Sequence, residues 1–124
     1  MKIILYANGL KTLGKKLKNM IHKQIAGTQF KNYNSIEHIS QTLRQPLSNV
    51  SIMVLLVSSR DELIQFNLMN TLFDNIKVIL VLPDRQKDML ELGHKLKPSF
   101  ISDVNSNLQD IVSVLEQIKK KENK

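Results

Sequence analysis

Apolar residues recur along the chain in short unbroken runs, and longer segments of mixed apolar and polar residues separate these runs. Three of the runs have the length of a strand: KIILYA (residues 2–7), SIMVLLV (51–57) and KVILVL (77–82). Continuous hydrophobicity, in contrast to strict alternation, predicts strands that are covered on both faces, as in a parallel sheet. Two more polar segments, residues 28–33 and 99–104, are expected to form an edge strand and a short fifth strand.

The segments between these strands have helical periodicity. In residues 10–25 the apolar side chains fall on one arc of a helical wheel and the lysines on the opposite arc. Residues 36–45 and 106–119 carry similar apolar stripes, and residues 85–95 are expected to form a further helix. In residues 60–74 the apolar side chains spread around most of the wheel. More apolar surface than a sheet can cover suggests a second contact, such as a homodimer interface. The alternatives are a helix packed deeply between its neighbours, or helix boundaries that differ from 60–74.

Several of these helices begin with a capping signal. In a capping box, a polar residue and an acid or amide three positions later satisfy each other's backbone N–H groups. Three pairs have this spacing: Asn34 with Glu37, Ser59 with Glu62, and Ser106 with Gln109. Asp84 follows Pro83 and is predicted to be a simple N-cap. Asp61 falls in the first turn of the helix that Ser59 begins, where its charge suits the helix dipole.

Strands and helices alternate strictly over residues 1–124, and we find no internal repeat or linker. This order predicts a single α/β domain, a (βα)5 three-layer sandwich with right-handed crossovers. For five strands we expect a parallel sheet in the order 2-1-3-4-5. In that arrangement the functional crevice lies beyond the carboxyl ends of the first and third strands, where the winding of the sheet reverses.

This layout, with the passage ELGHKLKPSFISDV (residues 91–104), resembles the receiver domain of bacterial response regulators over nearly the full length of the chain. The resemblance implies a flavodoxin-like fold and a phosphorylation site at the carboxyl edge of the sheet. In that family, acids after the first strand bind Mg²⁺, and an aspartate at the end of the third strand accepts the phosphoryl group. A Ser or Thr ends the fourth strand and a Lys ends the fifth.

Each of those positions departs from the family pattern in this chain. At the ends of the first, third, fourth and fifth expected strands, the chain has Ala-Asn-Gly (7–9), Val-Ser-Ser (57–59), Leu-Pro-Asp (82–84) and Ser-Asp-Val (102–104). Mg²⁺ needs carboxylate oxygens, and phosphoryl transfer needs both the metal and a cation that neutralises charge. We therefore expect a degenerate receiver-like domain that is not an enzyme, has no catalytic residue and binds neither a metal nor a cofactor.

Polar residues nonetheless gather at the expected switch point of the sheet. A small-ligand or nucleotide site there would be lined by Asn8, Gly9, Ser58, Ser59 and Asp84. The simpler interpretation is that these residues only end strands at the protein surface. The segment ANGLKTLG lacks the glycine and lysine spacing of a phosphate-binding loop.

The net charge of +7 is unevenly distributed. Residues 1–31 hold seven lysines and no acidic residue, whereas basic and acidic residues balance in the remainder. Such asymmetry favours an anionic partner, although a solvated helix face would have the same composition. The chain has three arginines and no tryptophan, which disfavours base-specific nucleic-acid recognition. Nucleic-acid binding through the basic first quarter remains an alternative.

We therefore expect a protein partner or a homodimer, in a signalling role. The candidate contact residues are three lysines of residues 10–25 and three apolar residues of residues 60–74: Lys11, Lys15, Lys18, Leu68, Met69 and Leu72.

Composition excludes several other classes of function. The chain has no cysteine, which rules out disulfides, cysteine-ligated zinc, iron–sulfur clusters and thiol catalysis. Its three histidines fall on three different predicted helices, so no short-range metal-ligand pair is present. No window approaches the roughly 20 apolar residues of a membrane span. The first apolar run is not followed by an A-x-A-like cleavage site. A cytoplasmic location is expected.

Overall fold

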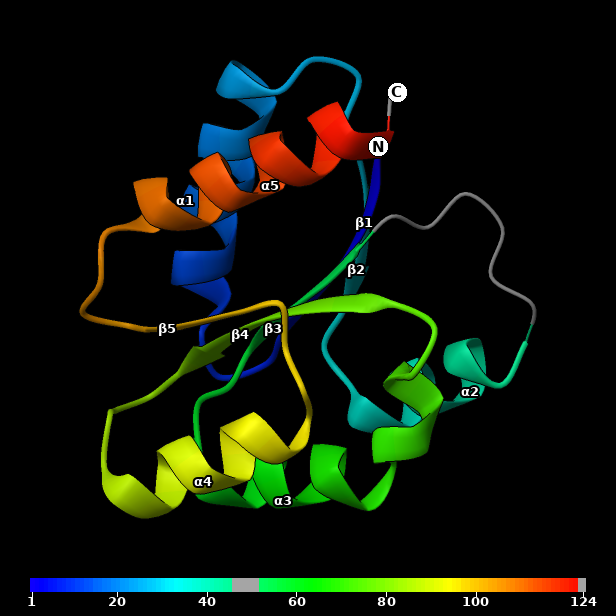
Figure 1. The fold of residues 1–124 in the computed structure, drawn as a ribbon, viewed down its shortest axis with the longest axis vertical. Helices are drawn as coiled ribbons and strands as arrows, with labels where there is room; N and C mark the ends of the chain where they lie inside the picture. Colours follow the sequence, from blue (N-terminus) through cyan, green and yellow to red (C-terminus); the bar gives the residue numbers. More distant parts are fainter. Residues whose placement is uncertain (46–51, 123–124) are drawn as a thin grey trace.

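The computed structural model describes residues 1–45 and 52–122 of the chain. Over these residues, strands and helices alternate in chain order (Figure 1). The strands are β1 (Lys2–Ala7), β2 (Gln29–Tyr33), β3 (Ile52–Leu56), β4 (Lys77–Leu82) and β5 (Phe100–Asp103). The helices are α1 (Lys11–Gln24), α2 (Ile36–Leu43), α3 (Arg60–Leu68), the 3₁₀ helix η1 (Asn70–Phe73), α4 (Lys87–Lys95) and α5 (Leu108–Glu122).

The five strands form one parallel sheet in the order β2-β1-β3-β4-β5. The predicted fold class, a flavodoxin-like (βα)5 sandwich, is therefore confirmed. In the register of the sheet, Leu5 of β1 lies between Asn32 of β2 and Val54 of β3. The winding reverses between β1 and β3, so the ends of these two strands meet at the switch point.

The helices cover both faces of the sheet. α1 and α5 lie on one face, and α2, α3 and α4 lie on the other (Figure 1). Every residue of β3 is buried, and alternate side chains enter the two apolar clusters. The unbroken apolar run of this strand thus reflects burial on both faces, as the sequence predicts.

The segment expected to form a single helix over residues 60–74 is instead two helices of different geometry. α3 ends at Leu68, Met69 breaks the helix, and η1 continues with three residues per turn. This change of winding turns Leu72 and Phe73 towards the core cluster under α2 and α3. The spread of apolar residues around the wheel therefore has a local cause, and a second contact is not needed to explain it.

Among the apolar contact residues proposed from this segment, only Leu68 is largely exposed, at 83 %. Met69 and Leu72 are half-buried against the core.

The start of α3 agrees with one half of the predicted capping box. The Ser59 hydroxyl accepts a hydrogen bond from the Glu62 N–H at 3.3 Å, as predicted. The Glu62 side chain, however, accepts from the Ser58 N–H and not from the Ser59 N–H. The other helix starts differ from the prediction. At α2 the N-cap is Ser35 and not Asn34, because Ser35 occupies the extended position from which a side chain reaches the third helical N–H.

Three further corrections concern α4 and α5. The N-cap of α4 is Gln86 and not Asp84. At α5 the side chain of Asn107, and not that of Ser106, accepts from the Gln109 N–H. The helix expected over residues 106–119 continues to Glu122.

The packing of α3 yields a test of these assignments. Phe66 is fully buried and makes edge-to-face contacts with Tyr6 and Phe73, with ring centroids 5.1 and 6.1 Å apart. Phe66→Ala should lower the free energy of unfolding by about 3–5 kcal/mol. Leu68→Ala, two residues away on the exposed side, should change it by less than about 0.5 kcal/mol. Urea denaturation of both variants measures the difference. A large loss at Leu68, with a concentration-dependent midpoint, would show instead that Leu68 is buried in a dimer.

Candidate functional site

The loop after β1 packs directly on the end of β3. A Cβ atom built on Gly9 would lie 2.4 Å from the Ser58 Oγ and 2.7 Å from the Ser58 Cβ, closer than real Cβ contacts allow. A side chain at position 9 would therefore displace Ser58. Both residues belong to the set that the sequence placed at the switch point.

Glu62 is the central group of the polar network at this edge. Its side chain turns back from the first turn of α3, and only 8 % of the residue is exposed. One carboxylate oxygen accepts hydrogen bonds from both the N–H and the hydroxyl of Ser58, each at 2.6 Å. The other oxygen accepts from the phenol of Tyr6, a β1 side chain buried beneath α3. A single carboxylate thus ties β1, the end of β3 and α3 together.

The environment of Tyr6 keeps its phenol protonated. Burial, followed by the hydrogen bond to Glu62 and the charge of that carboxylate, raises the pKa of Tyr6 well above its ordinary value, while the side chain of Asn8 opposes the rise. Tyr6 therefore remains a hydrogen-bond donor at neutral pH, and the carboxylate retains all three of its donors.

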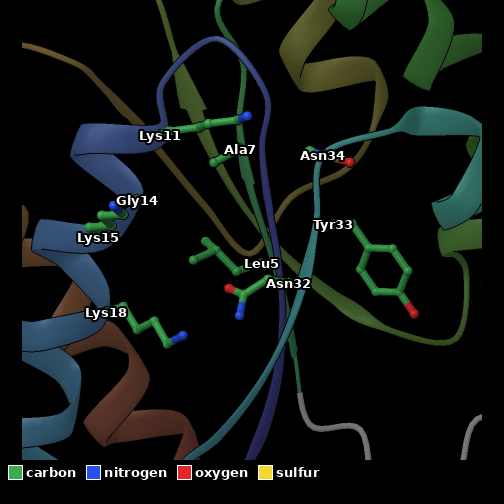
Figure 2. A pocket seen from close by; sticks show the side chains of 9 residues that line it. All are labelled: Leu5, Ala7, Lys11, Gly14, Lys15, Lys18, Asn32, Tyr33 and Asn34. Atoms are coloured by element: carbon green, nitrogen blue, oxygen red, sulfur yellow. The ribbon is translucent and has the colours of Figure 1, made fainter.

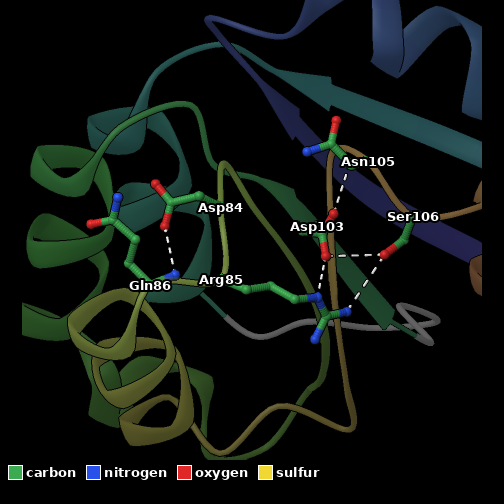
Figure 3. A network of polar contacts seen from close by, with 6 residues as sticks. All are labelled: Asp84, Arg85, Gln86, Asp103, Asn105 and Ser106. Carbon is green, nitrogen blue, oxygen red and sulfur yellow. Dashed lines mark hydrogen bonds and ion pairs between the residues drawn. The ribbon is translucent and has the colours of Figure 1, made fainter.

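A second polar network lies at the carboxyl ends of β4 and β5 (Figure 3). Asp103 pairs with Arg85, and it also accepts from the Asn105 N–H at 2.8 Å and from the Ser106 hydroxyl at 3.1 Å. Burial disfavours the charge of Asp103, but the hydrogen bonds from Arg85, Asn105 and Ser106 outweigh it and lower the pKa of the carboxyl. The charge of Asp103 is thus compensated by Arg85 and by the hydrogen bonds from Asn105 and Ser106.

Asp84 lies near this second network but makes a local contact. Its Oδ1 accepts from the Gln86 N–H at 2.9 Å, in the turn that leads into α4 (Figure 3). Among the described residues, Asp84 makes no hydrogen bond to the Glu62 network. Of the ligand set proposed from the sequence, Gly9, Ser58 and Ser59 come together with Asn8 beside them, whereas Asp84 belongs to a separate turn.

The three lysines proposed as contact residues do lie together. Lys11, Lys15 and Lys18 line one pocket of about 370 Å³ between α1 and the edge strand β2 (Figure 2). A second hollow of about 600 Å³ lies over the start of α1, and Asn8, Gly9 and Lys16 are among its lining residues. The two hollows share Lys11.

Sequence reasoning missed the roles of Glu62 and Arg85. It assigned Glu62 to a local capping box, whereas the side chain reaches Tyr6, 56 positions earlier in the chain. One signal was present: a tyrosine within an aliphatic strand needs a partner for its hydroxyl once it is buried. No sequence signal links Arg85 to Asp103, because that contact depends on the adjacency of β4 and β5.

Among residues 1–45 and 52–122, no cluster of three or more histidine or acidic side chains could hold a metal ion. No helix in the same part of the chain is long and apolar enough to cross a bilayer. No protein-family model matches the sequence, and a search of curated proteins finds no significant match.

Because the pKa of Tyr6 is raised in the folded protein, part of the folding stability should be lost at alkaline pH. A pKa that is higher in the folded than in the unfolded state contributes stability in full below about pH 10, the ordinary tyrosine pKa, and the contribution is lost as the pH rises further. Wild type should therefore lose about 1 kcal/mol of its stability advantage over Tyr6→Phe between about pH 9 and pH 11, and the rest at higher pH, because the loss continues up to the raised pKa. Urea denaturation at both values measures this difference, and the lysine contributions cancel in the comparison.

Ultraviolet absorption gives an independent reading of the same group. The chain has two tyrosines, so Tyr33→Phe leaves Tyr6 as the sole phenol. Its phenolate band should appear only above the ordinary tyrosine range, and it should shift to lower pH when Glu62→Gln is added. Titration of Tyr6 at an ordinary pKa would contradict the network.

Proposed function

We propose that this chain is a non-catalytic, receiver-like domain that acts in signalling through protein–protein contact, without aspartyl phosphorylation. The observation that most strongly supports the lack of aspartyl phosphorylation is the state of Glu62. This carboxylate lies beside the end of β3, the position at which a receiver carries its phosphoacceptor, and hydrogen bonds from Tyr6 and Ser58 occupy both of its oxygens.

Phosphoryl transfer to Glu62 would require breaking this network. An attacking oxygen would have to give up its donors, leaving either the Tyr6 hydroxyl or the Ser58 N–H without an acceptor. Each buried donor left unpaired costs about 1–3 kcal/mol. The network therefore favours a structural role for this carboxylate, as a clamp between two strands and a helix.

The solvent side of α1 is the surface proposed for the partner. The sequence placed the basic contact on Lys11, Lys15 and Lys18, but these three lysines line a pocket, so the proposal uses Lys16 and Lys23. At 100° per residue, Lys16 and Lys23 project to the solvent side of α1, roughly 130° from the row formed by Lys11, Lys15 and Lys18. None of these five lysines forms a salt bridge within the described residues. An acidic protein surface would be attracted to these uncompensated charges and oriented by them.

The absence of phosphorylation can be tested by amide NMR with Mg²⁺ and beryllofluoride, a phosphoryl analogue. We expect no saturable change in the amides of residues 57–62, because the Glu62 oxygens are engaged. Mg²⁺ alone serves as the control for non-specific ion effects. Saturable shifts at the end of β3 that need both reagents would overturn the proposal.

Partner binding can be tested with a photo-crosslinker at Asn19, an exposed residue of α1, in cells that express the chain. Lys16→Glu with Lys23→Glu should abolish a discrete protein adduct, because it reverses the charge of the solvent-facing row. Lys77→Glu with Lys87→Glu makes the same charge change at exposed sites on β4 and α4, and should leave the adduct intact. Equal loss in both variants, or an adduct with nucleic acid, would contradict the proposal.

A further inference from the structure

The pocket between α1 and β2 has a composition that the protein-contact proposal does not explain. It lies beside the edge strand, and its lining includes Leu5 and Ala7 of β1 as well as the three lysines. The remaining lining residues are Gly14, Asn32, Tyr33 and Asn34. An apolar floor with cations on one wall and amides on the other is the composition of a ligand site.

The pocket arises from the close packing of α1 on the centre of the sheet. A Cβ atom built on Gly14 would lie 3.1 Å from the Ala7 Cβ and 3.5 Å from the Leu56 Cδ1, so the helix backbone rests almost directly on β1 and β3. This position leaves β2 only partly covered. Phe30 is half-buried against Lys18 and His22, and Asn32, two residues further along β2, is exposed.

Several side chains of the pocket point towards a common space. Figure 2 shows Lys18 and Asn32 pointing towards each other across it, with Leu5 beside Asn32. Lys11 extends over Ala7 at the other end of the pocket, near the loop that follows β2. The Tyr33 ring points away to the other face of the sheet, where its hydroxyl bonds to that of Thr42 at 2.8 Å. Tyr33 therefore contributes only its backbone to the lining.

We propose that this groove binds a small organic phosphate with at least two negative charges. The phosphate would lie between the lysine row of α1 and the Asn32 amide, and an uncharged ring or short chain would lie on Leu5 and Ala7. This site is separate from the carboxyl-edge site that the sequence suggested, and it does not depend on the protein contact of the solvent-facing lysines.

Charge and size both select this class of ligand. The described lining residues hold three cations, two amides and no acid, so an anion entering the groove meets no repulsion. Lysine ammonium groups act as compact point charges that suit phosphate oxygens. The volume of about 370 Å³ lies near the lower end of the range for small-molecule pockets, about 300–1,000 Å³. It accommodates one phosphate with a ring, and not a nucleic-acid duplex.

Amide NMR and calorimetry with defined probes test the proposal. Adenosine 5′-monophosphate and a pentose 5-phosphate carry the phosphate on a pentose, with and without a base. O-phosphoserine carries it on an amino-acid side chain, and adenosine is the uncharged control. We expect at least one phosphate to bind saturably and to shift the amides of Gly14, Asn32 and Asn34. Adenosine should leave these amides unchanged. Preference for O-phosphoserine would assign the phosphate to a modified protein side chain, and preference for the other two to a free metabolite.

Two variants that each remove one positive charge distinguish a specific phosphate site from general electrostatic attraction to α1. Lys15→Ala should weaken binding by about tenfold or more, because it removes a charge-assisted contact within the groove. Lys23→Ala removes the same charge on the solvent side of α1 and should weaken binding by less than about twofold, since exposed charges at a distance are screened. Asn32→Asp places an anion in the groove and should abolish binding with little effect on the fold.

Either of two results would overturn the proposal. One is that none of the three phosphates shifts the groove amides at millimolar concentration. The other is that Lys15→Ala and Lys23→Ala weaken binding equally, which would indicate diffuse attraction to a basic helix. Both results leave the protein-contact proposal standing, because that proposal is tested through Lys16 and Lys23.

Discussion

Complete burial of β3 requires helices on both faces of the sheet, because its side chains alternate between the two apolar clusters. α1 and α5 supply one layer, and α2, α3 and α4 supply the other. With both faces committed to apolar burial, the polar side chains of the sheet can concentrate only where the strands end or where the edge strand is incompletely covered. The Glu62 network, the Asp103 network and the groove beside β2 all lie at such places.

The two buried acids are stabilised in different ways. Glu62 accepts from neutral donors, the Tyr6 phenol and the N–H and hydroxyl of Ser58, and so joins three elements without a cation. Asp103 depends on the guanidinium of Arg85, with Asn105 and Ser106 as further donors. In both cases the hydrogen-bonding capacity of the carboxylate serves the fold. That use is consistent with a domain whose function lies in its surfaces.

α1 presents three different surfaces around its axis. One packs on β1 and β3 through Gly14, Leu17 and Ile21. A second, with Lys11, Lys15 and Lys18, forms a wall of the groove, and the third carries Lys16 and Lys23 on the solvent side. The positive charge of α1 is therefore divided between the groove and the solvent side of the helix. A small anion and an acidic protein surface could occupy these two places without competing for the same lysines.

Sequence alone determined the fold class, the strand order and most element boundaries, because continuous apolar runs and helical periodicity are local consequences of burial on a sheet. It also placed Asn8, Gly9 and Ser58 at the switch point, since the ends of parallel strands meet there. Only the tertiary structure decided that Glu62 reaches Tyr6, that Arg85 neutralises Asp103, and that α3 ends at Leu68. The side-chain contacts join residues far apart in the chain, and the break in the helix follows from packing against the core. Neither leaves a periodic trace in the sequence, because each depends on the distance between elements once the sheet has formed.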